Sequence, residues 1–118
     1  MGGARVLIVE DDHDVAVAIQ NVLRVEGYEG VIASTVADAS ASMEGLHPAL
    51  VLLDWNLPDG CGADVVRAIR PHDASVPIVV MSAARDSLEA SLSVDARERL
   101  SKPFDLGRLV AILHRYCR

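Results

Sequence analysis

The chain has 118 residues and a mass of 12.6 kDa, which is the size of one domain. Apolar residues make up 51% and charged residues 24%, and these proportions indicate a globular chain and exclude a disordered one. No apolar run approaches the roughly 18 residues that a membrane-spanning helix needs. The net charge of −6 argues against non-specific nucleic-acid binding. We therefore predict a single domain, residues 1–118, that binds neither a membrane nor nucleic acid directly.

The first residues of the chain and its cysteines indicate the cellular compartment of the protein. The first residues lead directly into an apolar run and show no secretory signal. The two cysteines, Cys61 and Cys117, could form only one bridge, and neither belongs to a CxxC motif. Both observations favour a reduced, cytoplasmic protein.

Short apolar runs of β type alternate along the chain with longer stretches of helical period. The predicted strands are Val6–Val9, Val31–Ala33, Leu50–Leu53, Ile78–Met81 and Leu100–Ser101. The predicted helices cover Val15–Leu23, Ala37–Met43, Ala63–Arg70, Ser87–Ser93 and, after the capping residue Asp105, Leu106–Leu113. A turn is predicted over Asn56–Gly60. This alternation indicates an α/β fold in which a parallel sheet carries helices on both faces.

Polar residues follow four of the predicted strands. Glu10 and Asp11 follow the first strand, Asp54 the third, Ser82 the fourth and Lys102 the fifth. Lys102 is the only lysine in a chain with ten arginines, and lysine acts as a flexible point charge on phosphate. Ligands of open parallel sheets bind beyond the carboxyl ends of the strands, so we expect these side chains to meet there.

The expected cluster suits phosphoryl chemistry. Carboxylates packed closely repel one another unless a cation neutralises them, and a set of oxygen ligands suits Mg²⁺. Lys102 would neutralise phosphoryl oxygens and Ser82 would donate a hydrogen bond to them. Asp54 stands alone at its strand end and is the candidate nucleophile for an aspartyl-phosphate. Each residue also has an ordinary explanation, as a helix cap, a turn aspartate, a loop hydroxyl or a surface cation, but their joint occurrence at four strand ends favours a site.

The chain resembles the receiver domain of two-component response regulators over about residues 4–117. Four segments carry the resemblance: Val-Leu-Ile-Val-Glu-Asp-Asp from residue 6, Leu-Leu-Asp-Trp-Asn-Leu-Pro-Asp-Gly around Asp54, Val-Val-Met-Ser-Ala around Ser82, and Leu-Ser-Lys-Pro-Phe around Lys102. The resemblance implies a flavodoxin-like, doubly wound, five-stranded parallel sheet of order 2-1-3-4-5 with five flanking helices.

The resemblance also implies roles for single residues. Asp54 matches the phosphoacceptor, and Ser82 and Lys102 match the hydroxyl and the lysine that contact the phosphoryl group. Glu10 and Asp11 match the acid pair that binds Mg²⁺ (or Mn²⁺) together with Asp54. The position of Asn56 contributes a backbone carbonyl to that metal. The peptide bond before the proline that follows Lys102 is usually cis in this family.

The function implied is a phosphorylation-dependent signalling switch. A sensor histidine kinase or a phosphotransfer domain would phosphorylate Asp54, and an output partner that the sequence does not identify would respond. The domain is not expected to be an enzyme, beyond slow self-catalysed phosphorylation and dephosphorylation. The chain departs from the family pattern at Arg99, where an aromatic residue is usual. Ser82 and Lys102 are also 20 residues apart where about 22 is typical, so the fourth helix is expected to be short or irregular.

Two alternatives remain from the residues themselves. A pseudo-receiver would bind a partner without being phosphorylated, although the full set of site residues argues against it. A phosphatase of the haloacid-dehalogenase type also uses an aspartate at a strand end as nucleophile. Such an enzyme needs a second aspartate two residues later as general acid, and Asn56 stands there.

Overall fold

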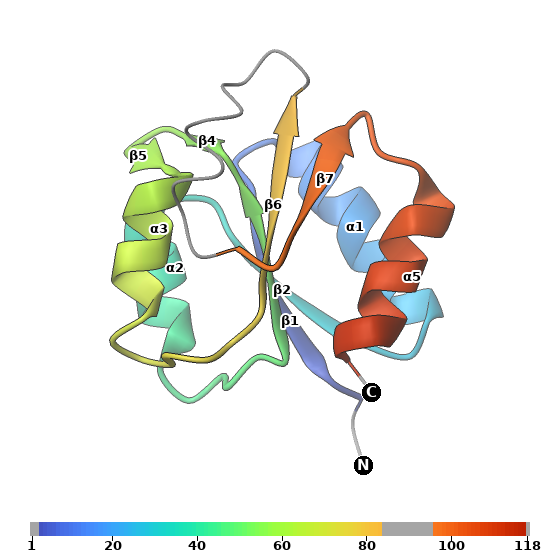
Figure 1. Ribbon diagram of the computed structural model, residues 1–118, viewed down its shortest axis with the longest axis horizontal. Coiled ribbons are helices and arrows are strands. Elements are labelled where there is room, and N and C mark those ends of the chain that lie inside the picture. Colours follow the sequence, from blue (N-terminus) through green and yellow to red (C-terminus); the bar gives the residue numbers. More distant parts are fainter. Residues whose placement is uncertain (1–2, 84–95, 118) are drawn as a thin grey trace.

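The computed structural model describes residues 3–83 and 96–117. A five-stranded parallel sheet forms its centre, and its strand order is β2-β1-β3-β6-β7 (Figure 1). These strands are β1 (Arg5–Val9), β2 (Glu29–Ala33), β3 (Leu50–Asp54), β6 (Ile78–Ala83) and β7 (Glu98–Lys102). The predicted α/β class and the order 2-1-3-4-5 of the five main strands are confirmed.

Helices cover both faces of the sheet. The helices are α1 (His13–Val25), α2 (Val36–Met43), α3 (Gly62–Ile69) and α5 (Leu106–Tyr116). Figure 1 shows α2 and α3 on one face and α1 and α5 on the other. The helix predicted over Ser87–Ser93 lies outside the described residues. In the parts of the chain that are described, no helix combines the length and the hydropathy needed to cross a bilayer.

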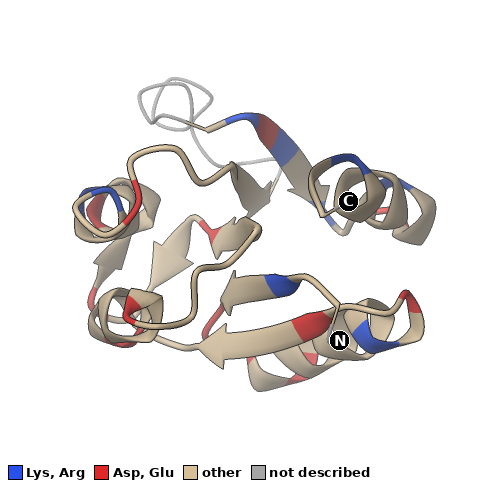
Figure 2. Cartoon of the chain, turned by 90° about the horizontal axis from the view of Figure 1, so that it is seen from below, with Lys and Arg blue, Asp and Glu red and all other residues tan. Residues whose placement is uncertain are grey.

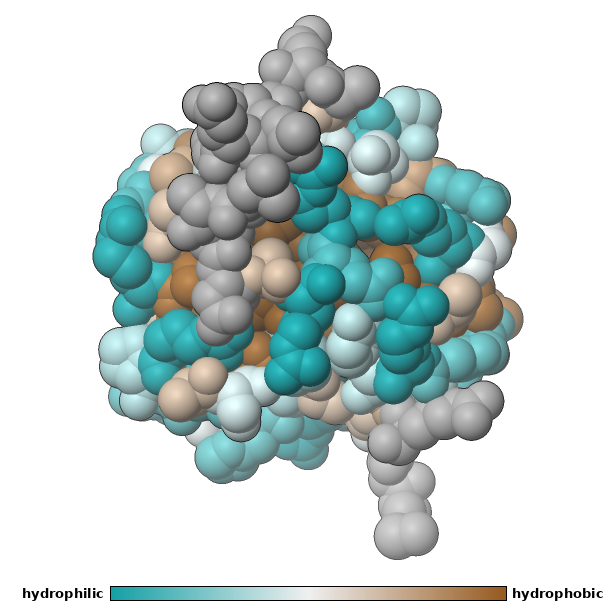
Figure 3. All heavy atoms as spheres, viewed as in Figure 1, coloured by the Kyte–Doolittle hydropathy of each residue, from teal (hydrophilic) through white to brown (hydrophobic). Residues whose placement is uncertain are grey.

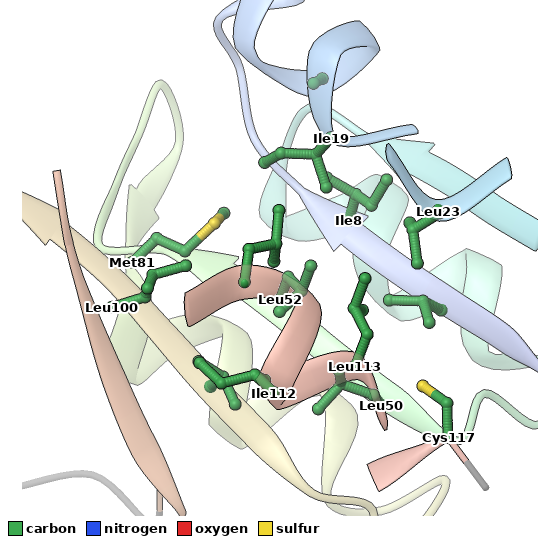
Figure 4. Close-up of a cluster of buried hydrophobic side chains, with 14 residues drawn as sticks. Ile8, Ile19, Leu23, Leu50, Leu52, Met81, Leu100, Ile112, Leu113 and Cys117 are labelled. Atoms are coloured by element: carbon green, nitrogen blue, oxygen red, sulfur yellow. The ribbon is translucent and has the colours of Figure 1, made fainter. Parts of the chain in front are cut away.

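The core consists of two apolar layers, one on each face of the sheet. Side chains alternate along a strand, so Ile8 of β1 packs in the layer under α1 and α5, whereas Leu7 packs in the layer under α2 and α3. Figure 4 shows Leu52, Leu113 and their neighbours converging in the first layer. Because the central strands are buried on both faces, their sequences are apolar except for the terminal residues Arg5 of β1 and Asp54 of β3.

Aspartates cap the two helices nearest to the carboxyl ends of β1 and β7. Asp12 accepts hydrogen bonds from the backbone N–H groups of Asp14 and Val15 at the start of α1. Asp105 accepts one from Gly107 at the start of α5, which confirms the predicted cap. Both caps fix the direction in which the chain leaves the sheet.

The structure differs from the prediction after β3. The segment predicted to be a simple turn forms an antiparallel hairpin of β4 (Asn56–Leu57) and β5 (Gly60–Cys61). Strands of two residues are too short to show an alternating pattern, and the turn-forming proline and glycine dominate the sequence there. The hairpin lies directly after Asp54 and belongs to the surroundings of the site.

Candidate functional site

The carboxyl ends of four strands surround one hollow, and all of them except β6 place polar side chains around it. This hollow has a volume of about 320 Å³ and lies at the ends of β1, β3, β6 and β7. Its lining residues are Glu10, Asp11, Asp12, Asp54, Asn56, Ala83 and Lys102. Five of the six residues predicted from the sequence, all except Ser82, therefore lie around the same space.

Lys102 joins the ends of three strands. Its Nζ lies 2.6 Å from Oε1 of Glu10 and 3.3 Å from Oδ1 of Asp54. Glu10 and Asp54 are buried, and the side chain of Lys102 is only 24% exposed. The ammonium therefore neutralises two carboxylates that are largely removed from water. A buried carboxylate without a cationic partner would cost free energy, because it has lost its hydration.

The proximity of these groups shifts their pKa values. Burial, together with the neighbouring Asp54 carboxylate, raises the pKa of Glu10 from 4.5 to about 7, and Lys102 opposes this only in part. Burial alone would lower the pKa of Lys102, but the hydrogen bond to Glu10 and the charges of both carboxylates raise it. The site thus holds more negative charge than its single lysine balances.

A divalent cation fits this surplus of charge. One carboxylate oxygen from each of Glu10, Asp11 and Asp54 lies within 4.8 Å of the other two. Oxygen-only donors of this kind are the ligands that Mg²⁺ takes in proteins. Asn56 lines the same hollow, as its predicted carbonyl contribution requires. The predicted ligand residues are therefore grouped as a metal site needs.

Ser82 is placed differently from the other predicted residues. It is the last residue but one of β6, beside Ser101 of β7, and it is 7% exposed, whereas Asp54 and Lys102 are the last residues of their strands. It does not line the hollow, whereas the next residue, Ala83, does. The contact of Ser82 with a phosphoryl group remains a prediction. The bond between Lys102 and Pro103 is cis, as the resemblance implies.

The arginines of the C-terminal region hold α5 against the edge strand β7. Arg115 and the hydroxyl of Tyr116 both donate to the carboxylate of Glu98. Arg108 donates to the backbone carbonyl of Arg99, which is half-buried on β7. Figure 2 shows basic residues on these two elements, and Figure 3 shows hydrophilic side chains over them.

One residue near the site was not predicted. Asp59, at the tip of the β4–β5 hairpin, accepts hydrogen bonds from the backbone N–H groups of Val36 and Ala37 at the start of α2. These partners are 23 and 22 residues away in the sequence, so no local pattern signals the contact. An Asp between Pro and Gly is typical of an ordinary turn, so the sequence gives no reason to assign it a further contact.

The fold and the site together define a class. An open parallel sheet with a carboxylate cluster and a lysine at its strand ends is the arrangement of α/β domains that hold a phosphoryl group at that edge. The chain belongs to the response regulator receiver domain family, whose model matches residues 6–114.

Curated relatives and solved structures agree with this assignment. The chain is 41% identical to the transcriptional regulatory protein PrrA of Mycobacterium tuberculosis over 110 residues, which are 91% of this chain and 47% of the relative. It is 38% identical to the DNA-binding response regulator MtrA of Mycolicibacterium smegmatis over 109 residues, 91% of this chain and 47% of the relative. The chain thus spans about half the length of these relatives.

Two solved structures illustrate the likeness of fold. One is the receiver domain of a sensor histidine kinase from Pseudomonas aeruginosa, described with a magnesium ion in its active site cleft. Its TM-score is 0.88 at 28% identity, with 98% of each chain covered. The other is a CheY-like response regulator receiver domain protein from Methanospirillum hungatei. It gives a TM-score of 0.88 at 27% identity, covering 97% of this chain and 93% of that chain.

Proposed function

We propose that this receiver domain accepts a phosphoryl group on Asp54 from a histidine kinase or a phosphotransfer domain. The observation that carries the proposal is the position of Lys102, whose ammonium contacts both Glu10 and Asp54 beside a carboxylate cluster. A buried acid pair that served stability alone would have no need of a third, exposed carboxylate, Asp11, at the same point. A site for an incoming phosphoryl group needs all of these charges.

The residues have distinct tasks in the proposed transfer. A carboxylate oxygen of Asp54 attacks the phosphorus of the donor phosphohistidine, and an acyl phosphate forms. The bond from phosphorus to the imidazole nitrogen breaks, and its electron pair stays on the imidazole. Lys102 neutralises the oxygens of the arriving group. Glu10, Asp11, Asp54 and the carbonyl of Asn56 would hold Mg²⁺ or Mn²⁺, which supplies further charge neutralisation when bound.

The purpose of the proposed reaction is a signal and not the turnover of a substrate. Slow attack of water on the acyl phosphate would release inorganic phosphate and return the free carboxylate, and no other turnover is expected. The phosphorylated domain would then act on an output partner. The matched relatives include a DNA-binding response regulator and a transcriptional regulatory protein, so a DNA-binding output unit is one candidate for that partner.

Intact-mass measurement after incubation with acetyl phosphate and Mg²⁺ tests the proposal. The wild type should gain the mass of one phosphoryl group, and Asp54→Asn should gain none because an amide is not a nucleophile. Asp38→Asn, on the exposed surface of α2, is the matched control and should be phosphorylated like the wild type. An unmodified wild type would favour the pseudo-receiver, and turnover of a generic phosphomonoester would favour the phosphatase.

A further inference from the structure

We propose that Asp59 is a positioning residue of this site, which fastens the β4–β5 hairpin, and with it Asn56, to the N-terminus of α2. This inference rests on the proposed function, because the hairpin follows Asp54 directly and Asn56 lines the hollow. Asp59 itself is exposed at the hairpin tip and does not line the hollow. Its effect would therefore be transmitted through the backbone of the hairpin.

The contacts of Asp59 close the start of α2 from another part of the chain. Oδ1 lies 2.8 Å from the backbone nitrogen of Val36, and Oδ2 lies 3.3 Å from that of Ala37. These are the first two residues of α2, and N–H groups at such positions have no partner within the helix. The partial positive charge of a helix N-terminus also favours a carboxylate there. Thr35, the residue before the helix, separately accepts a hydrogen bond from Asp38.

The hairpin needs an anchor at its tip. Each of its strands has two residues, and an isolated two-stranded hairpin is at best marginally stable. Its base is held because Trp55 donates from its backbone N–H to Met81 at 3.0 Å, and Gly62 donates to the carbonyl of Trp55 at 2.8 Å. At the opposite end, Asp59 accepts two hydrogen bonds from a helix that is itself fixed in the core.

The backbone of the hairpin also fits closely between two helices. A Cβ added to Gly60 would lie 2.7 Å from Oδ2 of Asp64 in α3 and 3.1 Å from Cγ2 of Val36 in α2. The hairpin therefore packs against Val36, the same residue of α2 whose backbone N–H donates a hydrogen bond to Asp59. Loss of the contact of Asp59 would remove these hydrogen bonds between the hairpin and α2, while the bond from Cys61 to Asp64 would still tie β5 to α3. The tip of the hairpin would then shift relative to α2, and we expect Asn56 to shift with it.

Thr35 provides a matched control for a test. Thr35→Val and Asp59→Ala each remove a side-chain cap from the start of α2, but only Asp59→Ala also releases the hairpin. Urea unfolding should show that both variants fold and lose stability. Titration with Mg²⁺, followed by the fluorescence of Trp55, the only tryptophan, then separates the two effects.

We expect Asp59→Ala to raise the Kd for Mg²⁺ by up to roughly 10-fold, the lower end of the effect of losing a group bonded directly to a metal ligand, because Asp59 acts on Asn56 only through the hairpin backbone. Thr35→Val should keep the wild-type Kd, and Asp59→Asn should lie between, since its amide oxygen can still accept one of the two hydrogen bonds. The rate of phosphorylation by acetyl phosphate at limiting Mg²⁺ should fall in the same order, with Thr35→Val like the wild type, Asp59→Asn slower and Asp59→Ala slowest.

Two results would overturn the inference. One is a wild-type Kd in Asp59→Ala, and the other is an equal rise in Thr35→Val, which would assign the effect to α2 stability alone. A wild type that neither responds to Mg²⁺ nor is phosphorylated would refute the proposed function itself, and the role of Asp59 with it. The failure of the inference alone is therefore distinguishable, because wild-type binding and phosphorylation would then remain.

Discussion

The indole ring of Trp55 occupies the space that a side chain on Gly62 would need. A Cβ added to Gly62 would lie 2.7 Å from Cζ3 and 3.2 Å from Cδ2 of that ring. Trp55 comes directly after Asp54, and Gly62 is the first residue of α3. This contact therefore sets how closely α3 approaches the chain that leaves the candidate phosphoacceptor.

Replacing Gly62 with alanine should disturb this contact. We expect Gly62→Ala to lower the free energy of unfolding by about 1–3 kcal/mol, because the ring is buried and has to shift. The tryptophan emission should also move to longer wavelength as the ring becomes more exposed. Urea unfolding and emission spectra measure the two effects.

Gly107→Ala is the control for this prediction. A Cβ on Gly107, in the first turn of α5, would meet its nearest neighbour, Oδ2 of Asp105, at 3.6 Å, which is ordinary contact. Alanine favours a helix over glycine by about 0.8–1.0 kcal/mol in helix interiors, so this variant should be neutral or stabilised. Equal losses in both variants would mean that the contact with Trp55 has no special importance.

Cys61 occupies the N-cap position of α3, where a stronger hydrogen-bond acceptor would serve better. Its backbone N–H donates to Oδ2 of Asp64 at 2.9 Å, but a thiol accepts hydrogen bonds weakly. Cys61→Ser should raise the free energy of unfolding by about 0.5–1 kcal/mol, as measured by urea unfolding, since serine is a preferred N-cap. Cys61→Ala tests the alternative, because a gain of the same size in alanine would trace the effect to removal of the thiol.

The prediction was most successful for elements whose apolar residues follow directly from burial. The strands around Ile8 and Leu52 are buried on both faces, so their apolar runs indicated a covered parallel sheet. That topology brings the carboxyl ends of strands together, and so it placed Glu10, Asp54 and Lys102 at one edge.

Other features depend on contacts that no local pattern records. The hairpin after β3 has strands of two residues, and Asp59 meets α2 only because the tertiary fold brings them together. Ser82 was expected beyond the end of its strand, but β6 continues to Ala83 and pairs with the whole of β7. The extra pairing follows from the neighbouring strand, which also proved longer than its two predicted residues.

Lys102 should not tolerate arginine. Its single nitrogen contacts Glu10 and Asp54 in a largely buried position, and a planar guanidinium distributes its donors over a wider fork. We expect Lys102→Arg to fold, but to be phosphorylated by acetyl phosphate more slowly than the wild type, as followed by intact mass over time. Arg108→Lys, the reverse exchange on the exposed side of α5, should keep the wild-type rate. Unchanged kinetics in Lys102→Arg would remove Lys102 from the site.

The raised pKa of Glu10 predicts how stability depends on pH without a metal. Because burial and Asp54 raise this pKa from 4.5 to about 7, the folded protein binds more protons than the unfolded chain between these values. The contribution of Glu10 to stability is therefore lost as pH rises through this interval, by on the order of 3 kcal/mol in total.

Glu10→Gln isolates this contribution, because glutamine keeps the shape of the side chain and does not ionise. The free energy of unfolding of the variant, minus that of the wild type, should increase from about pH 4.5 to about pH 7 and then level off. Urea unfolding with a chelator present, at several pH values, measures this difference. Mg²⁺ should reverse the effect, since it binds the ionised carboxylate, and so it should stabilise the wild type more at about pH 8 than at about pH 5. A difference that stays constant over this range would show that Glu10 ionises in the folded protein as it does in the unfolded chain.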